Sequence, residues 1–353
     1  MLPKERVLEA LNHREADRIP IMDNPWFTTL DRWIEEGFPE NTLPEDYFEF
    51  DMVGFHPDAS FMLPERIIEE TDEYIILNDH NGALKKDWKH RTSTPELIDF
   101  SLTSREKWEE LKSNLVFRPE RLNTEEDRPR LKRAKEKDKF IMLQSGIGYD
   151  RFSSIVGPMT LLPALLTDPD WASDMFGTHT DLLLRCAEEM FNLGYDLDGA
   201  FVCDDLGYKN GVFFSTEVYR NVLKPHHRRL CDFFHEKGCN VILHSCGNVK
   251  QHIPDLIDAG FDCLQALEVK AGMDVTELKK EYGDNLCFMG GIDVRKMSHP
   301  DPGVIEEEIR TKVSFAKKDG GYIYHSDHSV PDNVSLERFE YIMDLVKKYG
   351  SYS

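Results

Sequence analysis

Residues 240–268 read NVILHSCGNVKQHIPDLIDAGFDCLQALE. The stretch begins with a short apolar run that ends in the polar sequence HSCG. An amphipathic segment follows at 249–259, and a second apolar run at 262–268 ends in a glutamate. This order is typical of a β-strand, a crossover helix and a second, parallel β-strand.

The same alternation extends on both sides of this stretch. Most of the apolar runs end in ionisable side chains, and a closed barrel brings all strand ends to one mouth, whereas an open sheet spreads them along an edge. No GxGxxG or P-loop motif follows any run, which disfavours a nucleotide-binding open sheet. We therefore expect an α/β fold of the (β/α)8 TIM-barrel class. The further predicted strands are 140–146, 199–205, 286–293 and 321–331, and the further predicted helices are 215–237, 275–282 and 304–318.

The first 140 residues are less regular. They predict a helix at 3–12, a short strand at 19–22, and a hairpin around 74–88 with its turn at Asn81-Gly82. We interpret these as an N-terminal helical extension and a hairpin inserted at the barrel rim. Because no linker or repeat divides the 353 residues, we expect one barrel domain over 1–353.

Composition excludes several classes of protein. A formal net charge of -22 repels nucleic-acid phosphates and anionic lipids, so we expect neither as a partner. No apolar run is long enough for a membrane span, and the first residues lack the apolar centre of a signal peptide. The seven cysteines are an odd number and all lie in the second half, which predicts reduced thiols and a cytoplasmic protein.

The strongest chemical signal is His244-Ser245-Cys246-Gly247. In an extended segment, side chains two residues apart point to the same side, so the imidazole and the thiolate can bind one ion. This ligand pair suits zinc. The alternative is a structural histidine beside an inert core cysteine, and the pair alone does not exclude it.

A catalytic zinc site takes three protein ligands and leaves a fourth position open. The segment YHSDHSVP offers His325, Asp327 and His328 at the end of the last predicted strand. Each of them has a structural alternative, such as capping a helix or fixing a loop. Three such groups within four residues nevertheless favour a site.

Four carboxylates at strand ends are candidate catalytic groups. For each, the functional interpretation is proton transfer, orientation of a ligand histidine or contact with substrate. The structural interpretation is loop capping or stabilisation of the rim. These residues are Asp204, Asp205, Glu268 and Asp293.

Several segments together resemble one family, the uroporphyrinogen decarboxylase superfamily. The resemblance is carried, in chain order, by KERVLEALNHREADRIPI, VCDDLGYKNGVFFSTEVYRNVLKPHHRRL, VILHSCGNVKQHIPDLIDAGFDCLQALE, AGMDVTELKKEYGDNLCFMGGIDVRKM and GGYIYHSDHSVP. Within the superfamily the chain looks most similar to the corrinoid-dependent methyltransferases, such as the methylcobalamin:coenzyme M methyltransferases. The resemblance implies a (β/α)8 barrel and a zinc ion held by the His and Cys of an HxCG motif and by a late cysteine.

His244 and Cys246 match the first two of these ligands. The late cysteine is missing, and its position falls on His328, or on His325 if the loop shifts. Replacing a thiolate by a neutral imidazole raises the formal charge of a zinc centre from zero to plus one, which makes it a stronger Lewis acid.

The resemblance implies a zinc-dependent methyltransferase. It would move a methyl group between a small O-, N- or S-methylated substrate and the cobalamin of a separate corrinoid protein, since the chain has no DxHxxG motif for binding a corrinoid itself. One alternative is a tetrapyrrole decarboxylase, although the segment after the first strand offers only Arg32 to a polyanion. The other alternative is a non-catalytic small-molecule-binding barrel.

Overall fold

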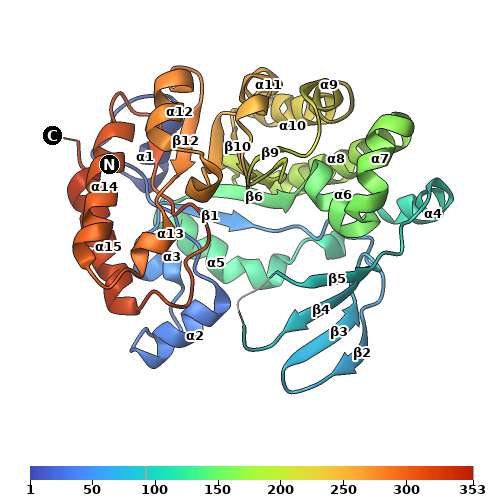
Figure 1. Cartoon of the computed structure of the whole chain (residues 1–353), viewed down its shortest axis with the longest axis horizontal. Helices are drawn as coiled ribbons and strands as arrows, with labels where there is room; N and C mark the ends of the chain where they lie inside the picture. The colour runs from blue at the N-terminus through green and yellow to red at the C-terminus, as the bar shows by residue number, and fades with distance from the viewer. Residues whose placement is uncertain (92–93, 353) are drawn as a thin grey trace.

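The computed structural model describes residues 1–91 and 94–352, and its central feature is a curled sheet of seven parallel strands. Their order in the sheet, β1-β6-β7-β10-β11-β12-β13, follows their order in the chain (Figure 1). All six predicted runs from residue 140 onward contain one of these strands, so the predicted alternation is confirmed. The strands are β1 (Met52–Phe55), β6 (Phe140–Gly146), β7 (Gly199–Cys203), β10 (Asn240–Ser245), β11 (Cys263–Ala266), β12 (Cys287–Gly290) and β13 (Tyr322–Ile323).

The predicted first strand joins the two edges of this sheet. On one side, the backbone N–H of Tyr324, directly after β13, donates to the carbonyl of Pro20 at 2.9 Å. On the other side, the N–H of Asp51, directly before β1, donates to the carbonyl of Ile21 at 2.8 Å. Residues 20–22 therefore occupy the eighth strand position, and the predicted TIM-barrel fold is confirmed.

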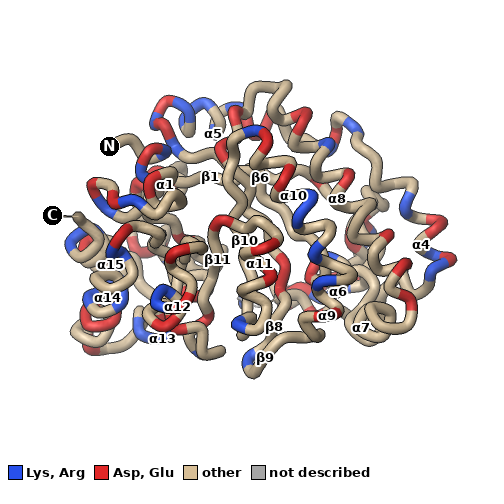
Figure 2. The backbone as a smooth tube through the Cα atoms, turned by 90° about the horizontal axis from the view of Figure 1, so that it is seen from above, with Lys and Arg blue, Asp and Glu red and all other residues tan. Residues whose placement is uncertain are grey.

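Helices cover the outside of the sheet (Figure 1). The predicted helix 215–237 is continuous, because a π-helical turn, Tyr219–Leu223, joins α9 to α10. Figure 2 shows acidic and basic residues interleaved along outer helices such as α5 and α14. The helices are α1 (Pro3–Leu11), α2 (Phe27–Glu35), α3 (Pro44–Tyr47), α5 (Thr124–Glu136), α6 (Gly148–Val156), α7 (Pro158–Thr167), α8 (Pro169–Asn192), α9 (Thr216–Val218), α10 (Lys224–Glu236), α11 (Ile253–Ala259), α12 (Val275–Tyr282), α13 (Val294–Met297), α14 (Pro302–Ala316) and α15 (Leu336–Gly350). Among the described residues, no helix combines the length and apolarity that a membrane crossing requires.

Alternation along the strands divides the apolar residues into two clusters. On β6, Phe140 and Met142 belong to the smaller cluster, which fills the barrel interior, whereas Ile141 and Leu143 belong to the larger one between strands and helices. Burial of these side chains, at roughly 25 cal/mol per Å² of apolar surface, is the main favourable term for the fold. The interior cluster also contains Met22, Met52, Phe201, Ile242, Cys263, Cys287, Met289 and Ile323.

Inward positions become polar toward the carboxyl ends of the strands. Continuing the alternation, β6 places Gln144 inward, β10 places His244 inward, and β11 places Gln265 inward. Cys203 of β7 lies beside His244 in the strand register. The barrel thus has an apolar floor and a polar mouth, which is where barrel enzymes build their sites.

The segment between β1 and β6 carries the rim insertion. The predicted hairpin forms from β3 (Tyr74–Asn78) and β4 (Leu84–Trp88), with Gly82 in its turn at a φ of +77°. It is the centre of a larger, four-stranded antiparallel sheet, because β2 (Arg66–Glu70) and β5 (Glu96–Asp99) add to its edges. Helix α4 (Arg105–Leu111) follows. The two edge strands are short and exposed, which leaves a weak hydrophobic pattern in the sequence.

Candidate metal centre

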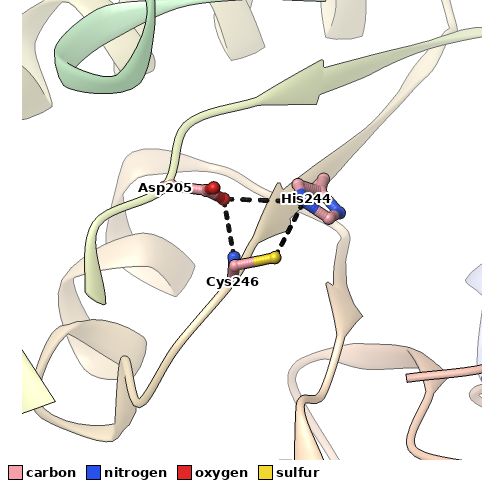
Figure 3. Close-up of side chains that lie close together, drawn as sticks. All are labelled: Asp205, His244 and Cys246. Carbon is pink, nitrogen blue, oxygen red and sulfur yellow. Dashed lines mark hydrogen bonds and ion pairs between the residues drawn. The ribbon is translucent and has the colours of Figure 1, made fainter. Parts of the chain in front are cut away.

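Three side chains converge at the ends of β7 and β10. The Sγ of Cys246 lies 3.5 Å from Nε2 of His244, and the same Nε2 lies 3.5 Å from Oδ1 of Asp205. One ligand atom from each residue lies within 4.8 Å of the others. Figure 3 shows the three side chains facing one another. The predicted pairing of His244 with Cys246 is therefore present, and a carboxylate joins it.

Asp205 reaches this group because β7 and β10 are neighbours. Cys203 and His244 are partners in the register, and the next residue along, Asp204, continues the ladder by donating its N–H to the carbonyl of His244 at 2.9 Å. Asp205 then turns toward β10, where its Oδ1 accepts the backbone N–H of Cys246 at 2.7 Å. This hydrogen bond fixes the carboxylate beside the thiol.

The imidazole of His244 is oriented by Gln265. The two residues are partners in the register of β10 and β11, and Oε1 of Gln265 contacts Nδ1 of His244. An amide oxygen can only accept a hydrogen bond, so this contact suits the neutral tautomer in which Nδ1 carries the proton. In that tautomer the lone pair of Nε2 faces Cys246 and Asp205, as metal-binding histidines require.

The group is rich in negative charge. Burial, followed by the charges of Asp205 and Glu268, raises the pKa of the Cys246 thiol well above its ordinary value. Burial and the nearby Asp205 and Asp204 likewise raise the pKa of Asp150 to about 7. A divalent cation would offset this repulsion and stabilise the thiolate, so the electrostatics favour a metal ion.

The three donor types fit zinc. Imidazole nitrogen, thiolate and carboxylate are its usual protein ligands, and three of them leave one position open. With Asp205 as third ligand, a zinc centre would be formally neutral, in contrast to the plus one expected for an imidazole at that place. Among the described residues, Asp205, His244 and Cys246 form the group of at least three potential ligands whose donor atoms lie close enough together to hold one metal ion.

The structure does not bring His328 or His325 to this group. The ring of His328 packs against Trp26, with 6.0 Å between the ring centroids. Nδ1 of the buried His325 bonds to the carbonyl of Ser326 at 2.7 Å. Gln265 stands between the two histidines, because its amide contacts His244 on one side and lies 3.3 Å from Nδ1 of His325 on the other.

A profile of the uroporphyrinogen decarboxylase (URO-D) family matches residues 130–349, more than half of the chain. The chain belongs to the URO-D family. This confirms the superfamily expected from the sequence.

One curated relative is the uroporphyrinogen decarboxylase of Vesicomyosocius okutanii, which is 26% identical over 78 residues. The match covers 22% of this chain and spans about a fifth of the relative, 22% of its length. Among solved structures, a methyltransferase from Methanosarcina mazei superposes with a TM-score of 0.70 at 16% identity, covering 99% of each chain. At that identity the likeness concerns the fold. A B12-independent methionine synthase from a Shewanella species reaches a TM-score of only 0.43 at 10% identity, covering 87% of this chain and 83% of that one.

Asp204 of this URO-D family member turns away from Asp205, His244 and Cys246, the candidate metal-binding group. It is fully buried, and its Oδ2 lies 3.0 Å from Nε2 of His227 on α10. Its Oδ1 accepts the N–H of Asp150 at 2.8 Å and so anchors the start of α6. These contacts agree with the structural interpretation of Asp204, in which the carboxylate stabilises loops at the rim.

Glu268 and Asp293 lie at the mouth and hold loops. Glu268 accepts the N–H of Gly247 at 2.9 Å and pairs with Lys270 at 2.8 Å. Asp293 caps α13 and pairs with Arg295 at 2.6 Å. Together with Trp26, Asp327 and His328, both acids line a pocket of about 380 Å³. They thus share a cavity with His328, although none of these residues belongs to the metal-binding group.

Sequence reasoning missed Gln265 and Asp150. Gln265 is the polar inward residue of the strand DCLQALE, and Asp150 follows the end of β6 as the other carboxylates follow theirs. A polar residue in an otherwise apolar strand was the available signal for Gln265. No local pattern indicated that Gln265 would face His244.

Proposed function

We propose that this URO-D family protein is a zinc-dependent methyltransferase. In this proposal a methyl group moves between a small O-, N- or S-methylated substrate and the cobalamin of a separate corrinoid protein. The observation that supports it most is the group formed by Asp205, His244 and Cys246 at the barrel mouth. Its three donor types and its open side suit a catalytic zinc ion.

The chain's own residues would hold and position this centre. His244, Cys246 and Asp205 supply the ligand atoms, and Gln265 fixes the ring of His244 with Nε2 inward. Glu268 fixes the turn after Cys246 through the N–H of Gly247. A zinc ion bound here would supply a Lewis acid that polarises the heteroatom from which the methyl group departs.

The tetrapyrrole decarboxylase alternative finds less support. Arg32 on α2, the arginine in the segment after the first strand, donates through Nε to Glu36 at 2.7 Å. Its Nη1 donates to the carbonyl of Asp332 at 2.8 Å. Because it is engaged in these bonds, it is poorly placed to bind the several carboxylates of a tetrapyrrole.

Metal analysis of the purified chain tests the zinc part of the proposal. We expect about one zinc ion per chain in the wild type, and strong loss of zinc in His244→Ala, Cys246→Ala and Asp205→Ala. Cys203→Ala is the matched control, because this half-buried thiol lies beside His244 but outside the group. Zinc-free wild-type protein, or zinc that survives in Cys246→Ala, would favour the non-catalytic barrel.

The same measurement separates the candidates for third ligand. If Asp205 is the ligand, His328→Ala and His325→Ala retain zinc, and Asp205→Ala does not. If instead His328→Ala loses zinc while Asp205→Ala keeps it, the late loop supplies the ligand.

The methyl-transfer part needs an activity measurement. Zinc-loaded protein is mixed with a reduced corrinoid protein and with methoxy, methylamine or methylthio donors, and methylation of the cobalamin is followed by its visible spectrum. Transfer from at least one donor class is expected. If no donor reacts with zinc-loaded enzyme, the proposal fails even though the metal site stands.

A further inference from the structure

Arg151, in the first turns of α6, is a half-buried cation that forms no ion pair among the described residues. Its Nε is buried and has no hydrogen-bond partner within the described part of the chain. The hydrogen bond that its side chain makes is a long one of 3.4 Å, from Nη2 to Oδ1 of Asn81. An unpaired buried charge costs free energy, so its presence calls for a compensating partner.

A neighbouring arginine shows how the fold satisfies such a group. Arg121 is fully buried, and its guanidinium donates to four backbone carbonyls at 2.5–2.8 Å. The fold therefore satisfies one guanidinium with backbone and leaves the other with free donors. The four acceptors of Arg121 are Asn114, Val116, Asp58 and Ser60.

The charges that act on Arg151 come from Asp58, Asp79 and its chain neighbour Asp150. The first two each hold a turn. Oδ1 of Asp58 accepts the N–H of Ser60 at 2.8 Å, and Oδ1 of Asp79 accepts the N–H of Asn81 at 2.8 Å. Both carboxylates thus stabilise turns and form no ion pair with Arg151 among the described residues. Burial lowers the pKa of the Arg151 guanidinium despite these charges.

Arg151 faces a pocket of about 500 Å³ between the rim sheet and the barrel mouth. Asn81, Gln144 and Ser145 line it as well, together with three carboxylates that form no ion pair with Arg151 among the described residues, those of Asp58, Glu65 and Asp79. A guanidinium presents a planar fork of donors, which matches the two oxygens of a carboxylate. The pocket therefore suits a small organic acid whose carboxylate pairs with Arg151.

The pocket lies close to the metal-binding group. Gly146 lines it and is the register partner of Cys203, which is in turn the partner of His244. Two strand spacings of about 4.8 Å place Gly146 about 10 Å from His244. Gly146 itself has no side chain, and a Cβ added there would meet only Cδ of Arg151, at 3.9 Å. At this position β6 therefore places no side chain between the pocket and His244.

We infer that Arg151 binds the carboxylate of a small organic acid in the pocket beside the metal-binding group. The anion-binding site stands on the geometry of the pocket alone. The inference also has a part that rests on the proposed function. In that part, the acid is the methyl-bearing substrate, and its methylated heteroatom reaches toward Asp205, His244 and Cys246. A substrate with both groups would span a distance similar to that between Gly146 and His244.

Calorimetric titration with benzoate and benzamide tests the anion site. The two probes have nearly the same shape, and only benzoate is charged. We expect benzoate to bind the wild type at least tenfold more tightly than benzamide, and Arg151→Gln to weaken benzoate binding at least tenfold. Lys85→Gln, which removes another cation from the pocket lining, should change the affinity by less than about twofold.

Several results would overturn the inference. These are no benzoate binding to the wild type, equal benzoate affinity in wild type and Arg151→Gln, and an equal loss in Lys85→Gln. Tighter Arg151-dependent binding of inorganic phosphate would overturn the carboxylate assignment. Benzoate binding is measured on the purified chain without methyl transfer, so this result is independent of the metal and activity tests above.

Thermal unfolding separates a ligand-binding arginine from a structural one. Without ligand, Arg151→Met should unfold at the same temperature as the wild type or higher, because it removes a charged group whose buried Nε has no hydrogen-bond partner among the described residues. Arg121→Met is the matched control. It should lower the midpoint temperature of unfolding by several degrees, because four backbone carbonyls would lose their hydrogen-bond donor. A comparable drop in Arg151→Met would assign Arg151 a structural role instead.

Discussion

The side-chain amide of Gln265 on β11 orients the imidazole of His244 on β10 through a cross-strand contact between Oε1 and Nδ1. The contact sets the tautomer of His244 and aims Nε2 at Cys246 and Asp205. The amide nitrogen of Gln265 also lies 3.3 Å from Nδ1 of His325. One residue thus links the metal-binding group to the last strand of the barrel.

Gln265→Leu should weaken zinc binding by about 10–100-fold, because the oriented acceptor for His244 is lost. Gln265→Glu keeps an acceptor at the same place and should bind zinc at least as tightly as the wild type. Competition with a chromophoric chelator measures both affinities. Equal affinity in Gln265→Leu and the wild type would contradict the orienting role.

The two adjacent aspartates should separate metal binding from stability. Asp204→Ala leaves the buried His227 and the N–H of Asp150 without their partner, which should cost about 3 kcal/mol of unfolding free energy. Asp205→Ala loses one half-buried hydrogen bond, worth about 1 kcal/mol, but should lose zinc. Urea unfolding of the zinc-free proteins and metal analysis give the two quantities. A larger loss of stability in Asp205→Ala than in Asp204→Ala, or loss of zinc in Asp204→Ala but not in Asp205→Ala, would contradict this prediction.

Stability should decrease in acid partly because of His179. Burial, followed by the nearby charge of Arg151, lowers the pKa of His179 to about 3. The unfolded chain takes up this proton near pH 6.5, and the folded chain only near pH 3. Lowering the pH between these values therefore favours unfolding, by up to about 1.4 kcal/mol per pH unit.

His179→Gln removes this titrating group and should flatten the dependence. The free energy of unfolding in urea, measured at intervals between pH 7 and pH 4, compares the two slopes. Parallel curves for variant and wild type would show that His179 does not contribute.

Gly247, which follows Cys246, should tolerate no side chain. It adopts a φ of +77°, and a Cβ there would lie 2.3 Å from the backbone carbon of Gly207. Gly247→Ala should therefore cost more than about 2 kcal/mol and displace the turn that follows Cys246. In the control, Gly272→Ala, the φ of +83° is similar, but the nearest atom lies 3.8 Å away, so a cost of about 1 kcal/mol is expected. Chemical unfolding of both variants measures the difference.

Local patterns along the chain were enough to predict the barrel and two of the three residues of the candidate metal-binding group. Strand and helix periodicity depends on neighbouring residues, so runs such as 140–146 and 240–247 predicted parallel strands correctly. The spacing of His244 and Cys246 placed both side chains on one side of a strand, because alternation is also a local property. For the same reason the hairpin turn at Gly82 was predictable.

Which side chains meet across strands became visible only in the three-dimensional arrangement. It showed that Asp205 faces the pair and Asp204 faces α10, since adjacent residues point opposite ways and the sequence does not tell which one points inward. It placed Gln265 on His244 and left Arg151 unpaired. It also packed His328 against Trp26, a contact between residues far apart in the chain that distance along the chain does not reveal.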